Sequence, residues 1–145
     1  MIQRKQTIWL LLAVVLNVFA VFTDIYRWTE KTASGDVQHE LKVNNHYPSL
    51  ILLIAAISLP SVAIFMFANR KKQLGVTAMA MVACMSAISM NLARVSSTTK
   101  DIAAAANGTY WIGAILPLVA VVFLVLAIIG IKSDDKLVKS MDRLR

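Results

Sequence analysis

Four long apolar runs, separated by short polar segments, constrain this chain more than any other feature of its sequence. The runs cover residues 8–25, 50–68, 74–95 and 110–131. At about 1.5 Å per residue, a helix over each run reaches across a hydrocarbon core of about 30 Å. Of the 145 residues, 58% are hydrophobic and 16% charged, whereas soluble chains carry about 25% charged residues. The sequence therefore predicts an all-α polytopic membrane protein, a four-helix transmembrane bundle in a single domain.

Lysine and arginine residues predict which side of the membrane holds the termini. Four spans place both termini on one side, and ten of the 15 Lys and Arg residues lie there, in the N-terminus, the connection after residue 68 and the tail 132–145. Because cytoplasmic segments hold the excess of these residues, we expect both termini in the cytoplasm. The net charge of +7 is then explained by orientation and by attraction to anionic lipid rather than by nucleic-acid binding.

The connections differ in length and in what they can form. The one over residues 69–73 is so short that the second and third helices must be antiparallel neighbours. In the outer connection 26–49, Ala33-Ser34-Gly35-Asp36 is a turn signal, and the residues after it predict a short hairpin or a single amphipathic turn. In the outer connection 96–109, residues 103–106 can form a short helix.

Three polar residues near the outer ends of their helices share one layer of the predicted bundle. Counted from the inner ends, Asp24, Asn91 and Arg94 lie at about 24, 25 and 30 Å along their helices. We expect Asp24 to pair with Arg94, with Asn91 or with both, tying the first helix to the third. An ion or proton path would need such groups to continue inward, and the sequence lacks them, so a structural role is favoured.

Mid-depth polar residues and small residues indicate helix packing. Asn17 lies about 14 Å along the first helix, and Ser58 and Ser61 of the second helix fall at a matching depth for hydrogen bonding. In the third helix, Ala83 and Ala87 form a small-xxx-small pair that favours close packing in the bundle or in an oligomer.

Metal, cofactor and catalytic motifs are not recognised in the sequence. His39, Glu40 and His46 lack a known ligand spacing, and the single Cys84 among methionines of the third helix is a poor candidate for metal binding. We find no nucleophile elbow, phosphate-binding loop or zinc-protease motif. We therefore expect no cofactor and no enzymatic activity.

The tail predicts a short amphipathic helix on the cytoplasmic side. Ser133 suits an N-cap, and apolar residues then recur at helical spacing opposite a basic face. Such a helix suits docking to the inner leaflet or to a protein partner, two alternatives of equal weight. The candidate docking residues are Leu137, Val138, Met141, Arg143, Leu144 and Arg145.

Three segments carry a resemblance to a known family. They are the opening Met1-Ile2-Gln3-Arg4-Lys5-Gln6-Thr7, the passage Ile64-Phe65-Met66-Phe67-Ala68-Asn69-Arg70 with Gln73, and the closing residues 135–145. Together they resemble an uncharacterised family of small four-helix inner-membrane proteins of the Bacteroidota. Members more often have an apolar residue at the position of Lys5 and Lys at that of Ala68. The resemblance implies the fold, a bacterial inner-membrane location and the lineage, and it implies no activity.

These observations lead to a functional expectation. We expect a non-enzymatic accessory or structural subunit of a larger membrane complex, in contact with lipid and with a membrane-protein partner or a second copy. The alternative is a small transporter or channel that acts as a homo-oligomer, with Asn17, Asp24, Asn91 and Arg94 lining a path. A third possibility, a sensor in which the outer connection detects a signal and the tail reports it, has no binding motif in its support.

Overall fold

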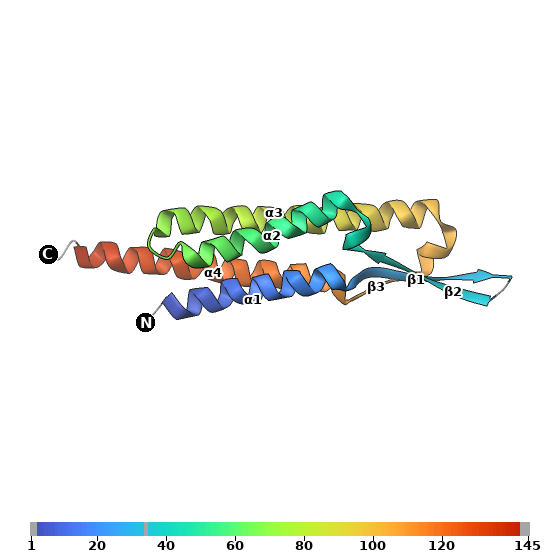
Figure 1. The fold of residues 1–145 in the computed structure, drawn as a ribbon, viewed down its shortest axis with the longest axis horizontal. Coiled ribbons are helices and arrows are strands. Elements are labelled where there is room, and N and C mark those ends of the chain that lie inside the picture. The colour runs from blue at the N-terminus through green and yellow to red at the C-terminus, as the bar shows by residue number, and fades with distance from the viewer. Residues whose placement is uncertain (1–2, 34, 143–145) are drawn as a thin grey trace.

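Four long helices run side by side along an elongated molecule, and a small antiparallel sheet extends from one end (Figure 1). The computed structural model describes residues 3–33 and 35–142, and the side chains of residues 5–33 and 35–136. The elements in chain order are α1 (Gln3–Phe22), β1 (Asp24–Thr32), β2 (Gly35–Lys42), η1 (Val43–Asn45), α2 (Tyr47–Phe65), α3 (Arg70–Asp101), η2 (Ala103–Asn107), β3 (Thr109–Tyr110) and α4 (Ile112–Asp142). We call the end that carries the sheet the sheet end, and the end where α1 begins the terminal end.

Each helix packs against two neighbours through a stripe of mostly small residues. α1 and α3 both contact α2 and α4. The buried residues of α3 recur every three or four positions and include Ala80, Cys84 and Ala87. Small side chains let helix axes approach closely, which suits association without a strong hydrophobic driving force.

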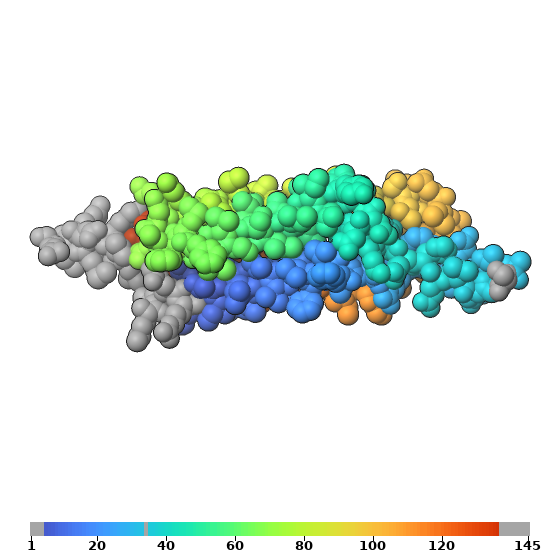
Figure 2. Space-filling view, in the orientation of Figure 1, coloured from blue at the N-terminus to red at the C-terminus, as the bar shows by residue number. Residues whose placement is uncertain are grey.

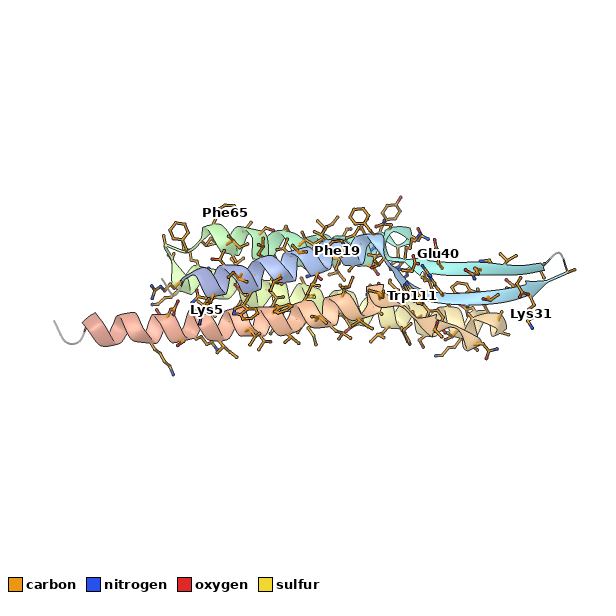
Figure 3. All side chains as sticks on the ribbon, turned by 90° about the horizontal axis from the view of Figure 1, so that it is seen from below. Lys5, Phe19, Lys31, Glu40, Phe65 and Trp111 are labelled. Atoms are coloured by element: carbon orange, nitrogen blue, oxygen red, sulfur yellow. The ribbon has the colours of Figure 1, made fainter. Side chains whose placement is uncertain are left out.

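Large apolar side chains cover the outside of the helices. Phe22 is 72% exposed and Phe65 80% exposed, and Figure 3 shows Phe19 and Phe65 pointing away from the helices. All four helices are long and apolar enough to cross a membrane, and only 28% of each spanning window is buried. Monomeric soluble proteins rarely expose apolar surface of this extent.

The protein is mostly helical, as expected, but it is not all-α, because the outer connections form a three-stranded sheet. Its strand order is β2-β1-β3, and both pairs are antiparallel. β1 begins two residues after α1 ends, so the first helix stops three residues before the expected limit of its run. Ile25 is nevertheless buried, because it packs into the core at the base of the sheet rather than on a helix.

The hairpin alternative for residues 26–49 is confirmed. β1 and β2 pair from Asp24↔Lys42 to Thr32↔Gly35, and the predicted turn lies at their junction. Gly35 has a φ of 127°, a conformation that favours glycine and explains that residue in the turn.

α3 and α4 are both longer than their apolar runs. α3 continues to Asp101, where Thr98 Oγ1 donates to the Arg94 carbonyl at 3.0 Å. α4 continues unbroken to Asp142, so the expected separate tail helix with Ser133 as its N-cap is wrong. Residues 132–136 contain no proline or glycine to end the helix, and contacts at the terminal end hold them. The short α2–α3 connection confirms that these helices are antiparallel neighbours.

Candidate functional site at the sheet end

The outer part of the β1–β2 hairpin projects beyond the helices as an arm (Figure 1). In this part the cross-strand pairs are Thr29↔Gln38, Glu30↔Val37 and Lys31↔Asp36, and all six residues are exposed. We call residues 29–38 the hairpin arm, and Figure 2 shows it as a narrow projection from the body of the molecule. A two-stranded hairpin with no buried face is marginally stable in water. The arm therefore gains its stability from its base rather than from its own contacts.

The base of the hairpin is held by Tyr26 and by the segment around η2. Tyr26 is buried, donates from its hydroxyl to the Ala105 carbonyl at 2.8 Å, and meets Tyr110 edge-on at 5.2 Å between ring centroids. A Cβ atom on Gly108 would lie 2.5 Å from Cε1 of Tyr26 and 2.7 Å from the Arg27 carbonyl oxygen. Glycine at this position lets the chain after η2 press directly on β1.

A charged cluster joins the hairpin base to α3. Asp24, 4% exposed, accepts a 2.6 Å hydrogen bond from Arg27 Nε, and Lys42 Nζ lies 3.6 Å from its other oxygen. Lys42 also donates to Glu40, which raises the pKa of the Lys42 ammonium and keeps it charged. Arg94 Nη1 donates to the Lys42 carbonyl at 3.1 Å.

The expected direct pairing of Asp24 with Arg94 or Asn91 is therefore wrong. Asp24 lies in a strand rather than at the end of a membrane helix, and the hairpin supplies its cationic partners. Asp24 and Arg94 do share a layer, but Lys42 lies between them and contacts both. The sequence alone did not predict this contact, because Lys42 is brought next to Asp24 only by the pairing of β1 with β2.

A cleft of about 800 Å³ lies beside the hairpin arm. Its lining combines charged, amide and aromatic side chains from β1, β2 and the segment from η2 to α4: Arg27, Trp28, Thr29, Glu30, Lys31, Gln38, Ala104, Asn107, Thr109 and Trp111. Figure 3 shows Trp111 near the base of the sheet and Lys31 far along the hairpin. The lining therefore offers both signs of charge, amide and hydroxyl groups, and aromatic rings to a bound molecule.

Two aromatic residues organise the cleft. The Arg27 guanidinium lies 4.3 Å from the centroid of the Trp111 ring, a cation–π contact. Trp28 stacks on His39 at 5.3 Å, and its indole N–H is buried without a hydrogen-bond partner among the described residues. A buried donor without a partner costs free energy, about 1 to 3 kcal/mol.

His39, Glu40 and His46 each have separate partners. His39 lies 3.3 Å from Glu30, Glu40 pairs with Lys42, and His46 Nδ1 lies 2.9 Å from Ser49 Oγ at the start of α2. Within the described part of the chain, no group of three or more His, Cys, Asp or Glu residues could hold a metal ion.

The mid-depth polar residues do not form the expected contact. Ser58 donates to the Ala55 carbonyl and Ser61 to the Ile57 carbonyl, both within α2. Asn17 is fully buried, and its Oδ1 lies 3.7 Å from Cys84 Sγ on α3, while its Nδ2 finds no partner in the described residues. Ser58 is exposed, whereas Asn17 is buried, so Ser58 does not meet it in the core, and Ser61 is only partly buried.

The remaining predicted helix residues lie on α3. Ala87 is fully buried, and Ala83 is partly buried against the core. Asn91 is 6% exposed and lines a smaller cavity next to α4.

A polar cluster at the terminal end was missed by the sequence reasoning. Gln6 donates to the carboxylate of Asp134, which is buried, and Arg70 donates to the Asp134 main-chain carbonyl at 2.8 Å. These residues come from α1, α3 and α4. All three residues lie outside the apolar runs, where no helix contacts were predicted. No sequence pattern relates residues that are so far apart in the chain.

The predicted docking residues of the tail lie at the end of α4 or beyond it. Leu137, Val138 and Met141 belong to the backbone of α4. Arg143, Leu144 and Arg145 lie outside the described residues.

The fold and the cleft define a class: a small, mostly helical protein with four helices long and apolar enough to cross a membrane and a three-stranded sheet at one end. The chain belongs to the family described as domain of unknown function DUF4293, whose model matches residues 2–144. This confirms the resemblance to an uncharacterised family. No curated protein matches the chain.

Proposed function

We propose that this protein is an integral bacterial inner-membrane protein whose four helices form a transmembrane bundle. Both termini lie in the cytoplasm, and the sheet end faces the outer side. The apolar outer surface of the four helices supports insertion in the membrane. The distribution of charge supports the orientation, because Lys5, Lys71, Lys72 and Lys136 are exposed at the terminal end, where the positive-inside rule places the cytoplasm.

Within that membrane, we infer that the protein is a non-enzymatic accessory subunit of a larger complex. The observation that carries this inference is the hairpin arm, which is exposed on both strands and has the cleft beside it. Exposed strand edges and marginal hairpins are normally shortened or covered in soluble surfaces. A rigid base with an uncovered arm suits contact with a partner protein on the outer side.

The alternative, a small homo-oligomeric transporter or channel, has less support. It requires Asn17, Asp24, Asn91 and Arg94 to line one path. Instead, Asn17 contacts Cys84, Asp24 pairs within the sheet, and Arg94 holds the hairpin base. Of the four, only Asn91 lines the cavity next to α4.

The test is gentle extraction of the tagged protein from its own membranes in polymer discs, followed by mass spectrometry of what stays attached. The decisive variant replaces the hairpin arm with Asn-Gly between Trp28 and His39, which are cross-strand partners suited to a two-residue turn. The wild type is expected to carry one membrane complex in stoichiometric amount, and the shortened variant to lose it.

The matched control keeps the hairpin arm and changes the opposite end of the molecule. In it, Leu137 and Met141 at the end of α4 are both replaced by Asn, which tests the tail as the docking element instead. Loss of the complex in this variant alone would show that the partner binds the end of α4 on the cytoplasmic side. Recovery of the wild type alone, or only with copies of itself, would sink the subunit proposal and favour the transporter.

A further inference from the structure

One edge of the hairpin arm has no neighbouring strand. β2 pairs with β1 along its full length, whereas β3 pairs with only two residues of β1 on the other edge. From Trp28 to Thr32, β1 has no strand on that side among the described residues. β3 is short because the chain before it turns into η2, where Gly108 donates its N–H to the Ala105 carbonyl at 3.1 Å. The outer half of β1 is therefore an edge strand.

The cleft beside the hairpin arm follows this free edge. Its lining includes every residue from Arg27 to Lys31, together with Ala104, Asn107 and Thr109 of η2 and β3. Successive side chains of a strand point to opposite faces, so a space over one face would contact only every second residue. Contact with five consecutive residues places the cleft against the strand edge, where a longer β3 would continue.

The main-chain groups that face the cleft can be identified by alternation along β1. The Trp111 N–H donates to the Ile25 carbonyl at 2.9 Å, so Ile25 faces the β3 side. The Arg27 carbonyl oxygen faces the same side, because a Cβ atom on Gly108 would lie 2.7 Å from it. Every second residue of a strand faces the same edge. Residues 29 and 31 therefore present their N–H and C=O groups to the cleft, and these four groups have no partner among the described residues.

A second copy of the chain fits this edge poorly. Antiparallel pairing of the edge with its own copy must align residues 29 and 31 with residues of the same parity, which centres a two-fold axis on one residue. An axis at Glu30 or at Lys31 opposes that residue to itself, and an axis at Thr29 opposes Lys31 to Arg27. Like charges directly opposite one another are destabilising. The charge pattern therefore favours a different chain as the occupant.

The charges of the edge also indicate what that chain carries. Lys31 is exposed and takes part in no ion pair within the described part of the chain, whereas Arg27 pairs with Asp24 and Glu30 lies 3.3 Å from His39. Opposite charges on directly opposed residues stabilise a strand pair. An acidic residue opposite Lys31 therefore suits the occupant.

We propose that an extended segment of a partner protein adds to the sheet as a strand antiparallel to β1, with a carboxylate opposite Lys31. Its main chain bonds residues 29 and 31, as in other cases where a peptide extends an exposed sheet edge. This inference rests on the proposed function, because it specifies how the accessory subunit binds its partner.

The first test uses a defined peptide and the full-length protein in lipid discs. The probe is Thr-Val-Glu-Thr-Thr, blocked at both ends, whose Glu faces Lys31 when its last Thr faces Thr29. Its control is the same peptide N-methylated at these two residues, which removes the donors to β1. Deuterium exchange of single amides is followed by mass spectrometry with electron-transfer fragmentation.

The unmodified peptide is expected to slow exchange at Thr29 and Lys31 by about fivefold or more, because these amides gain hydrogen bonds. Exchange at Glu30 and Thr32 should change less, since their N–H groups already face β2. The N-methylated peptide is expected to slow none of them. Equal slowing by both peptides would overturn strand addition in favour of side-chain contacts, and no slowing by either would overturn binding at this edge.

The charge preference is tested with the same peptide carrying a fluorescent label. Lys31→Glu is expected to weaken its binding about two- to tenfold, because an attractive cross-strand pair becomes repulsive. A peptide with Lys in place of Glu should show the reverse preference, binding the variant more tightly than the wild type. Equal affinities in all four combinations would overturn the assignment of an acidic partner residue.

A second measurement applies the inference to the native complex. Thr29→Pro removes one N–H from the free edge and leaves those that face β2, a position where edge strands tolerate proline. Thr29→Ala removes the same side chain and keeps the N–H. In the extraction described above, the complex should be lost from the first variant and kept by the second.

Failure of this inference can be distinguished from failure of the proposed function. A complex that survives Thr29→Pro but is lost when the hairpin arm is shortened would overturn strand addition and leave the accessory subunit in place. Recovery of the wild-type protein without any partner would overturn both.

Discussion

Single residues at the sheet end decide how closely the helices approach the strands. A Cβ atom on Gly113 would lie 2.5 Å from the Asp24 carbonyl oxygen and 2.8 Å from its carbonyl carbon. Both are main-chain atoms, which cannot rotate away. The first turn of α4 therefore lies against the α1–β1 junction only because residue 113 lacks a side chain.

Gly113→Ala is expected to lower the free energy of unfolding by about 1 to 3 kcal/mol, because the added methyl group forces main-chain segments apart. Gly75→Ala is the matched control, since a Cβ atom there meets nothing within 4 Å. That control should be neutral or stabilising by up to about 1 kcal/mol, because alanine favours the helix. Thermal unfolding in detergent, followed by circular dichroism, compares the two. Equal melting temperatures would show that α4 is not pressed against the junction.

Asp24→Asn is expected to destabilise the sheet end by about 1 to 3 kcal/mol, because a buried carboxylate that pairs with Arg27 and Lys42 loses its charge. The control is Asp101→Asn, an exposed residue at the end of α3. Hydrogen exchange of β1 and β2 amides should accelerate in the first variant and not in the second. Unchanged exchange rates in both variants would show that the charged cluster does not stabilise the hairpin.

At the scale of elements, the apolar runs predicted all four long helices correctly. The wrong predictions concern the polar segments, which form the sheet and the end of α4. The strand Asp24-Ile25-Tyr26-Arg27-Trp28 does not alternate apolar and polar residues, because its first residues are buried on both sides by helices and η2. A periodicity of two was therefore invisible there. The end of α4 was misassigned because the charged residues after the apolar run were taken as the end of the helix. None of those residues breaks a helix, and α4 continues through them.

The candidate site shows the same limit. Trp111 lies far from Trp28 and Lys31 in the sequence, and only the position of the segment from η2 to α4 brings it to their cleft. Asp24 and Arg94 were recognised as one layer because helix depth can be counted, whereas Lys42 between them could not be placed without the strand pairing.

The terminal ends of α1 and α4 are expected to depend on one polar pair. Gln6→Leu should cost about 1 to 3 kcal/mol, because the buried Asp134 carboxylate loses its donor. Gln6→Leu combined with Asp134→Leu should recover most of that loss, and the double-mutant cycle gives the coupling energy. Additive effects in the cycle would mean that the two side chains do not interact.

For the whole molecule, the proposed orientation predicts which surfaces a membrane-impermeant thiol reagent reaches. In a Cys84→Ala background, which removes the single native cysteine, Lys31→Cys in the hairpin arm should react in intact cells whose outer barrier has been opened. Lys71→Cys at the terminal end should react only after the inner membrane is permeabilised. The reverse pattern would invert the topology and place the hairpin in the cytoplasm.

The length of β1 limits which proteins could meet the tip of the hairpin. Nine extended residues from Asp24 to Thr32 measure about 25 to 30 Å, and their first residue follows α1 almost at once. If the strand stands upright, its tip reaches a height close to the thickness of the hydrocarbon core itself. A binding partner confined to the bilayer would pass beneath it. In the proposed orientation, a partner that binds this tip needs a folded domain or a long loop that stands equally tall above the membrane.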